Sequence, residues 1–579
     1  MKKLTIQNYA ELQTYIALAN YPECNSNTMT LLLWSNQYEV TFETQEHFAI
    51  VYSQTHYHPG VWLMPFCLKE HRKEALLYME KRSKELGYDF TIYSMTKEFK
   101  SWLHQTFPQT YFTFPTRDAD DYVYDRFQQE SLVGKKMQKR RNHFHAFVKE
   151  YENRYVFKPI EPSDHKAIIA FLKRWKENKD PSEYETIDVE IKGILNFLKH
   201  WDELPILGSC IYVDDCLEAF NIVSYLQPDM VQIHVEKANK QIRGLYIAIL
   251  KLFLETLPKH VTTLNREDDM GLVELRKTKT DMNPIYKVAK FACVKEPYHI
   301  MQATPKWKQP IKDLWLDRFQ EETSASTTFY FDHCYDEKNT WICVHDDTLL
   351  SMVQLREMPI SYNGQSTMTY FIVGVATNKD YEGCGYMDEL LTTVFQQSPY
   401  KDCNYLCLQA YNWDLYKHLG FEEVYKLQFV RIDQETYAKP KGTFTSCKDA
   451  DTLLAIYQAY TKEFNGYRIR DLAYYETTWI PYAAVWGLDI LQFSYEGEVL
   501  GYVQCEVHDD ECIVHECMYT KAFAKEAMLS LLCKQYPRVR VFAPLDDEYC
   551  GKSKPCTTMA VRCKNHPMIL DHLYIHETI

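Results

Sequence analysis

The stretch that decides the fold reads FIVGVATNKDYEGCGYMDELL, from Phe371 to Leu391. Its first six residues, Phe371 to Ala376, are apolar and partly β-branched, which predicts a buried strand. Two glycines one residue apart, Gly383 and Gly385, then precede a segment with apolar residues at helical spacing. Glycines at a helix start let successive backbone N–H groups point into one concavity, and the helix dipole adds positive potential there. The stretch therefore predicts a strand, a glycine turn and a helix that bind a phosphate or diphosphate.

The segments around this turn predict the rest of a sheet. The expected elements are a hairpin of strands at 341–345 and 349–355, then, after the turn, a strand at 405–409, a short helix at 413–419 and a strand at 424–432. A hairpin, a strand that ends in a phosphate loop, a helix and a strand, followed by the sequence LYKHLGF, resemble the GNAT N-acetyltransferase superfamily. The resemblance implies that acetyl-CoA is the co-substrate.

Six residues align with the loop pattern of that family, Gln/Arg-x-x-Gly-x-Gly/Ala. They are Glu382, Gly383, Cys384, Gly385, Tyr386 and Met387. The middle glycine fits and the first and last positions depart; a bulky apolar residue at the last position resembles the Eis-type (enhanced intracellular survival) acetyltransferases. The resemblance implies that main-chain atoms of these six residues hold the CoA diphosphate. Backbone N–H groups from Val373 to Val375 would serve the pantetheine arm and the oxyanion.

Catalysis is expected at Tyr416, in the segment WDLYKHLGF. GNAT enzymes often keep a Tyr general acid at this place, and its hydroxyl would protonate the leaving thiolate after direct attack by a primary amine. Packing between helix and sheet is the alternative role for this side chain. Glu357, Asp414 and His418 are three candidates for the general base, and the sequence does not choose among them.

Length and composition bound the protein class. A chain of 579 residues with 46% apolar and 25% charged residues suits three or four soluble domains. The net charge of −14 argues against a protein that coats nucleic acid or anionic lipid with its whole surface. The 18 cysteines contain no CxxC pair, and the first residues lack an apolar signal segment, so a cytoplasmic location is expected.

Neither a membrane span nor a metal site is expected from the sequence. No run approaches ~18 uninterrupted apolar residues. The densest group of candidate ligands, Cys550, Cys556, Cys563 and His566, has spacings that match no common zinc site. No metal cofactor is therefore predicted.

The same order of elements occurs four times, so the chain is predicted to be α/β (α+β). It is expected to hold four tandem GNAT-like folds, each a mixed, mostly antiparallel central sheet flanked by helices. The predicted domains are 1–115, 116–300, 301–440 and 441–579. The first and fourth lack a glycine loop and are not expected to bind CoA. The resemblance to Eis-type proteins also implies that the C-terminal tail packs back on the third domain.

The first and second domains show distinct expected features. In the first, strands are expected at 28–33 and 47–52. In the second, the loop keeps Gln241-x-x-Gly244 and carries Tyr246 at the third family position. One glycine makes a poorer anion nest than two, so the loop is expected to hold a donor other than CoA, or none.

Several longer motifs carry a second resemblance. They are Tyr122-Val-Tyr-Asp, Gly134-Lys-Lys-x-x-Lys-Arg-Arg-Asn-His143, the loop GLYIAI, Asn265-Arg-Glu-Asp-Asp-x-Gly271-Leu-x-x-Leu-Arg-Lys277 and Asn283-Pro284. Together they resemble the phosphatidylglycerol lysyltransferase C-terminal-domain family over about residues 20 to 298. The resemblance implies two tandem GNAT-like folds and an aminoacyl group taken from tRNA. The membrane-spanning half of the lipid-modifying enzymes is not in this chain.

Two charged groups lie within this region. Arg266, Glu267, Asp269 and Arg276 crowd a strand end and the following helix; they form either a rigid ion-paired turn or a clamp for a substrate carboxylate or phosphate. The second group is basic and consists of Lys135, Lys136, Lys139, Arg140 and Arg141. It is either a solvated helix face or a patch for phosphates of a nucleotide or tRNA.

The sequence leads to three hypotheses. The first is an N-acyltransferase that moves acetyl from acetyl-CoA to a primary amine of a small molecule or peptide in the third domain. The second is an aminoacyl transferase that uses aminoacyl-tRNA in the N-terminal half. The third is a binding scaffold of degenerate GNAT folds without catalysis.

Overall fold

The structure is a computed structural model that describes residues 1–55, 60–410, 412–433, 435–437, 441–545, 547–563 and 572–575. The chain divides into two compact units, Met1–Pro297 and Tyr298–Ile579. This boundary lies at the start of the proline-containing segment 297–310. The division of each unit into two domains stays a prediction.

The first unit contains two mixed sheets. The first sheet has the order β1-β2-β3-β4-β6-β15-β7, with β5 paired to β3. Its strands are β1 Lys2–Lys3, β2 Glu39–Thr44, β3 Phe48–Gln54, β4 Val61–Trp62, β5 Phe66–Cys67, β6 Thr91–Thr96, β7 Phe112–Pro115 and β15 Lys290–Val294. The accompanying helices are α1 Tyr9–Ala19, α2 Thr28–Leu33, α3 Arg72–Leu86 and α4 Lys97–Thr106. Strand β15 joins this sheet although it lies in the range predicted for the second domain.

The second sheet has the order β14-β8-β13-β12-β11-β10-β9. Its strands are β8 Asp121–Asp125, β9 Tyr155–Pro159, β10 Ile206–Val213, β11 Cys216–Gln227, β12 Met230–Ala238, β13 Thr263–Asn265 and β14 Tyr286–Val288. The accompanying helices are α5 Arg126–Ser131, α6 Gln138–Glu150, α7 His165–Glu177, α8 Tyr184–Lys199, α9 Leu245–Thr256 and α10 Val273–Asp281. Helix α9 packs its apolar residues against β12 and β13 and closes the core of this sheet.

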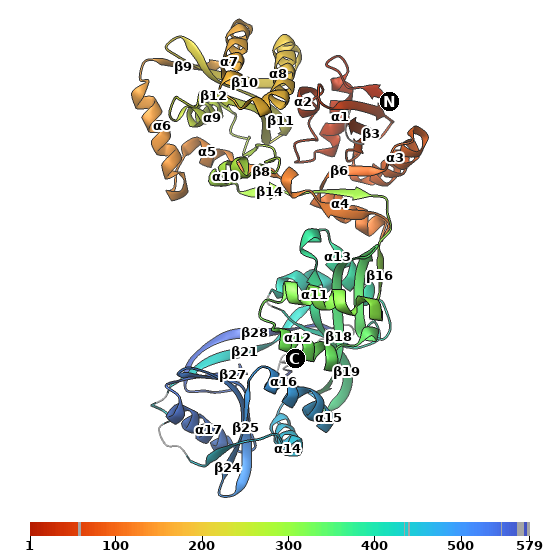
Figure 1. The fold of residues 1–579 in the computed structure, drawn as a ribbon, viewed down its shortest axis with the longest axis vertical. Coiled ribbons are helices and arrows are strands. Elements are labelled where there is room, and N and C mark those ends of the chain that lie inside the picture. Colours follow the sequence, from red (N-terminus) through yellow and green to blue (C-terminus); the bar gives the residue numbers. More distant parts are fainter. Residues whose placement is uncertain are drawn as a thin grey trace. The chain divides into compact units, whose positions relative to one another are not determined.

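The second unit is built on one long sheet, ordered β16-β17-β18-β19-β20-β28-β21-β27-β26-β25-β24-β22, with β23 and β29 paired beside β18. Its strands are β16 His299–Gln302, β17 Thr340–His345, β18 Thr348–Tyr362, β19 Gln365–Thr377, β20 Tyr405–Gln409, β21 Glu422–Ile432, β22 Thr443–Ser446, β23 Gly466–Arg468, β24 Asp489–Tyr495, β25 Glu498–His508, β26 Glu511–Tyr519, β27 Arg538–Pro544, β28 Gly551–Cys563 and β29 Leu573–Tyr574. The helices are α11 Lys308–Arg318, α12 Ser324–His333, α13 Tyr386–Val394, α14 Ala450–Thr461, α15 Leu472–Tyr474, α16 Ile480–Val485 and α17 Ala522–Gln535. In Figure 1, α11 and α12 lie across β18 and β19.

Strand β28 joins the two predicted domains of this unit into one sheet. It pairs with β20 on one side and with β21 on the other, so a strand from the end of the chain stands between two strands of the third domain. Figure 1 shows β28, β21 and β27 side by side. The expected packing of the C-terminal tail on the third domain is confirmed for this strand.

One connection recurs in each of the four predicted domains. A strand runs through a helix into a strand that pairs parallel to the first, as β4-α3-β6, β12-α9-β13, β19-α13-β20 and β26-α17-β27. Most other strand pairs are antiparallel. The mixed, helix-flanked sheets confirm the predicted α/β class, and the recurring connection is consistent with four tandem copies of one fold.

The predicted strand at 28–33 is wrong. These residues form helix α2, because the Asn27 side chain accepts a hydrogen bond from the Met29 N–H and caps the helix. All six residues are buried, so no polar face reveals the helical period. Among the described residues, no helix has the length and apolar content that crossing a membrane requires.

Candidate functional site

The glycine loop has the backbone geometry that its sequence predicts. Gly383 and Gly385 adopt φ values of 81° and 96°, a region that side chains with a Cβ rarely enter, and Gly385 immediately precedes α13. In the part of the chain that the structure describes, the N–H groups of Met387 and Asp388 find no backbone or side-chain acceptor. The loop therefore presents donors and the positive end of a helix dipole to an anion.

The strand before the loop leaves one edge open. The parallel ladder of β19 and β20 runs from Tyr370↔Leu406 to Ile372↔Leu408, whereas β19 continues to Thr377. Val373 and Val375 lie on this open edge, which we define as residues 373–377. A bulge in the pairing with β18 falls at the same place, where Gly374 has φ 63°. Among the described residues, no strand pairs with this edge, so its main-chain groups can hydrogen-bond to an extended ligand.

The other loop residues anchor the loop in the fold. Cys384 and Tyr386 are buried, and the Tyr386 ring packs on Tyr298 with centroids 5.0 Å apart. Met387 packs on the apolar cluster that contains Leu390 and Tyr416. These side chains fix the loop, so that its main chain is the part available to a ligand.

Three carboxylates surround the start of α13, and each has a partner. Glu382 forms an ion pair with Arg318, the last residue of α11. The Asp388 carboxylate lies 3.1 Å from His418 Nε2. The Tyr298 hydroxyl donates to Glu389. The sequence indicated Glu382 but not Arg318, which lies 64 residues upstream and becomes visible only through this contact.

Tyr416, the predicted general acid, belongs to the same apolar cluster. Its ring is buried and packs against Phe421. Burial, with a smaller effect from Asp388, raises the pKa of Tyr416 to about 12. The hydroxyl hydrogen-bonds to none of the described residues. It therefore keeps its proton at neutral pH and has it available for donation.

The three candidate bases differ in their surroundings. Glu357 is exposed on β18. Asp414 pairs with Lys417, and His418 pairs with Asp388. His418 is the one whose partner stands on α13, so the structure links it to the glycine loop.

In the first unit, the predicted substrate residues Arg266 and Asp269 do not pair with each other, and each has another partner. Arg266 Nη2 lies 2.9 Å from Glu236 Oε1. Asp269 instead accepts two hydrogen bonds from Arg276, at 2.9 Å each, and one from Tyr122. These contacts hold the pKa of the Asp269 carboxyl well below its usual range. Arg276 thus has a structural partner, while Arg266 faces the polar strand β12.

A polar face of β12 was missed at the level of sequence. Gln232, His234 and Glu236 alternate along a central strand, and all three are mostly or fully buried. The Gln232 amide donates to Glu267 Oε1 at 2.8 Å, and His234 Nδ1 lies 3.5 Å from the same oxygen. The alternation VQIHVE was the available signal, because polar residues at every second position of a buried strand share one face.

The second-domain loop is used for packing. Gly244 has φ 84°, and a Cβ there would lie 2.2 Å from the His143 carbonyl oxygen of α6. Gln241 is exposed and Tyr246 is half-buried. Helix α6 therefore fills the space in front of Gly244. This close approach explains why the position is a glycine, and no bound phosphate is needed to explain it.

The predicted basic patch divides into residues with different surroundings. Lys135 and Lys139 are exposed. The Lys136 ammonium donates a hydrogen bond to Asn283 Oδ1 at 3.0 Å, and Arg141 Nη1 donates one to the Leu132 carbonyl at 2.6 Å. Arg140 is different, because burial and the neighbouring Arg266 charge lower its pKa to about 10. Its Nε is buried and has no partner among the described residues.

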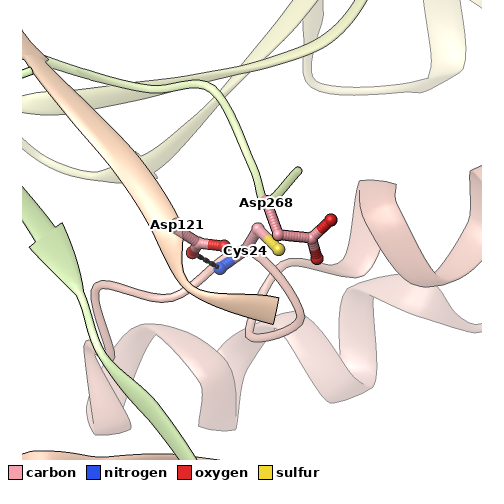
Figure 2. A group of neighbouring side chains, drawn as sticks. All are labelled: Cys24, Asp121 and Asp268. Atoms are coloured by element: carbon pink, nitrogen blue, oxygen red, sulfur yellow. Dashed lines mark hydrogen bonds between the residues drawn. The ribbon is translucent and has the colours of Figure 1, made fainter. Parts of the chain in front are cut away.

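A cluster of Cys24, Asp121 and Asp268 has the spacing of a metal site, with ligand atoms within 4.8 Å of one another (Figure 2). The Cys24 amide donates to Asp121 Oδ2 at 2.6 Å. The Lys290 ammonium, however, lies 2.6 Å from Asp121 Oδ1 and 3.2 Å from Cys24 Sγ. Burial also raises the pKa of the Cys24 thiol, which disfavours the thiolate that a metal needs. A lysine thus supplies the positive charge here.

The candidate zinc ligands considered from the sequence lie elsewhere, near the end of the chain. Cys550 is exposed, and the side chains of Cys556, Cys563 and His566 lie outside the described residues.

Replacing Asp268 by Asn is expected to stabilise the first unit at pH 7.5 by about 1–2 kcal/mol. Burial, and then the charges of Glu267 and Asp121, raise the pKa of Asp268 to about 6. The folded state therefore binds this proton more tightly than the unfolded state, and stability decreases as pH rises from about 4 to 6. Urea unfolding at pH 4 and 7.5 measures the free energy of unfolding of the wild type and of Asp268→Asn. An equal effect of the substitution at both pH values would contradict the raised pKa of Asp268.

Two family profiles match the chain. Residues 17–294 match the family described as phosphatidylglycerol lysyltransferase, C-terminal, and residues 299–424 match the family described as acetyltransferase (GNAT) domain. An uncharacterized protein of Mycoplasmoides gallisepticum is 25% identical over 174 residues, which are 30% of this chain and 55% of that relative. The chain thus spans about half the length of this curated relative.

Solved structures also match parts of the chain. A conserved protein of unknown function from Bacteroides thetaiotaomicron VPI-5482 is 22% identical, with a TM-score of 0.49, over 51% of this chain and 99% of that one. A probable N-acyltransferase from Enterococcus faecalis V583 is 16% identical, with a TM-score of 0.41, over 46% and 72% of the two chains. From the family profiles, residues 17–294 belong to the phosphatidylglycerol lysyltransferase C-terminal family, and residues 299–424 are a GNAT acetyltransferase domain.

Proposed function

We propose that the protein is an N-acyltransferase whose active site lies in the third predicted domain, with acetyl-CoA as donor and a primary amine as acceptor. Both matched families are described by group-transfer activities, which supports a transferase in general terms. The observation that carries the finer proposal is the two-glycine loop, Gly383 and Gly385, directly after the open edge of β19. The acceptor is a small molecule or a peptide.

The roles of the residues follow from their positions. Main-chain atoms of the loop, from Glu382 to Met387, bind the diphosphate. Main-chain groups at Val373 and Val375 align the pantetheine arm and stabilise the oxyanion. As the amine nitrogen forms its bond to the carbonyl carbon and the C–S bond breaks, Tyr416 gives its proton to the sulfur. His418 is the base that we favour, because its Asp388 partner stands on α13.

The cellular setting and the domain division are part of the proposal. The cysteines that the structure describes are all free thiols, which suits a reducing cytoplasm. The recurring strand–helix–strand connection supports four domains at 1–115, 116–300, 301–440 and 441–579, of which the third would bind CoA.

Replacing Gly385 by Ala is expected to weaken CoA binding at least about tenfold, because a Cβ at φ 96° strains the loop by about 1–3 kcal/mol. Gly497→Ala is the matched control, since Gly497 has φ 87° and open space around it in the fourth domain. Both variants should lose similar thermal stability. Only Gly385→Ala should lose the rise in Tm that CoA gives the wild type. Equal CoA responses of the two variants would argue against the loop as the binding site.

A second candidate function has its own observation. In the first unit, Arg140 Nε and Glu236 Oε2 are both buried and lack partners among the described residues, and Arg266 lies beside both. A ligand with a hydrogen-bond acceptor and a donor, such as the aminoacyl end of tRNA, would satisfy both atoms. Salt-sensitive binding of tRNA by the intact chain would favour this candidate.

A further inference from the structure

The ion pair between Glu382 and Arg318 stands at the first residue of the proposed diphosphate loop. Glu382 directly precedes Gly383, and Arg318 ends α11, where its charge also suits the helix C-terminus. The side chains are 42% and 29% exposed, so both reach solvent and a ligand can approach them. A diphosphate in the glycine loop would lie close to this pair.

The guanidinium contacts Glu382 through a single nitrogen. Nη2 donates to Glu382 Oε1, and in the described part of the chain no group accepts from Nε or Nη1. Arginine has five N–H donors in a planar fork that suits phosphate oxygens. Most of the donors of Arg318 are therefore unused in this contact.

The carboxylate has the opposite effect on an anion. Glu382 is negatively charged at the position where the GNAT loop pattern usually has Gln or Arg, and it repels a diphosphate that enters the loop. Arg318 offsets this charge through the ion pair. The affinity for the ligand then depends on how the guanidinium is shared between the carboxylate and the phosphate.

We propose that Arg318 is a CoA-binding residue that donates to the diphosphate, and that Glu382 competes with the ligand for this guanidinium and lowers the affinity. The proposal rests on the acetyl-CoA site proposed above. It assigns the cationic contact of this site to α11, outside the loop motif itself.

The test is isothermal titration of the full chain with CoA and with dephospho-CoA, which lacks the ribose 3′-phosphate. Arg318→Met should raise the Kd for both ligands by about tenfold or more, since charge-assisted hydrogen bonds to phosphate are lost. Glu382→Gln should lower the Kd several-fold. Arg318→Met should cost less in the Glu382→Gln background, because no uncompensated carboxylate is left beside the phosphates.

Lys312→Met serves as the control, since it removes a positive charge from the same helix at a lysine that contacts Thr328. It should leave both Kd values within about twofold. If CoA binds and Arg318→Met changes its Kd no more than Lys312→Met does, the inference is wrong and the ion pair is structural only. If Arg318→Met weakens CoA but not dephospho-CoA, the contact is to the 3′-phosphate and the assignment to the diphosphate is wrong. If neither the wild type nor Glu382→Gln binds CoA, the proposed function itself fails.

Discussion

Tyr416→Phe is expected to slow acetyl transfer by about two to four orders of magnitude while CoA affinity stays unchanged. The substitution removes only the hydroxyl, so the packing of the ring against Phe421 is kept. The thiolate would then leave without a proton from the protein. The measurement is thiol release from acetyl-CoA in the presence of a mixture of primary amines, compared with CoA binding by calorimetry.

Tyr381→Phe provides the matched control for this experiment. Tyr381 precedes the glycine loop on the same domain, and its ring contacts Tyr386 with centroids 6.5 Å apart. Its hydroxyl has no assigned role in the chemistry, so the rate should stay within about threefold of the wild type. A rate for Tyr416→Phe equal to that of this control would show that Tyr416 only packs.

Lys290→Met is expected to destabilise the first unit by about 3–5 kcal/mol, because it leaves a buried carboxylate without its counter-charge. The Lys290 and Asp121 side chains are 0% exposed and 2.6 Å apart, and Glu23 is 3.8 Å from the same ammonium. Lys290 belongs to β15 of the first sheet and Asp121 begins β8 of the second. The pair therefore joins the two sheets of this unit.

Lys295→Met is the control for this charge. Lys295 lies just beyond β15, pairs with Glu80 at 2.6 Å and is 37% exposed, so its loss should cost less than about 1 kcal/mol. Urea unfolding followed by amide hydrogen exchange in residues 1–297 compares the two variants. Equal stabilities would show that Lys290 is not the essential counter-charge of this cluster.

The local elements of the fold could be predicted because their signals lie within short segments. The strand at 405–409 agrees with β20 to the residue. Its apolar run lies between polar residues. The prediction for residues 28–33 was wrong because a short, wholly buried run does not distinguish helix from strand. The cap at Asn27 favours the helix.

The long-range pairings could not be predicted in the same way. Strand β28 stands between β20 and β21, and β15 joins a sheet whose other strands end at Pro115. Such pairings depend on the packing of whole sheets, and no local pattern records them. For the same reason, the ion pair between Arg266 and Glu236 on β12 could not be predicted.

The candidate site also has parts that local sequence predicts and parts that it does not. Motifs in short segments indicated Tyr416 and the loop Glu382–Met387, because glycine spacing and position in a family pattern can be read from neighbouring residues. Arg318 was missed because its importance depends on a contact between α11 and the loop. Gly244 followed the motif, yet its position against α6 gives it a packing role.

The most direct test of the central claim is native mass spectrometry of the intact chain with CoA. Among the described residues, only the third predicted domain has paired glycines after an open strand edge. We therefore predict one CoA per chain, with occupancy lost in Gly385→Ala and kept in Gly497→Ala. No bound CoA at concentrations up to the millimolar range, or occupancy that Gly385→Ala leaves intact, would contradict it.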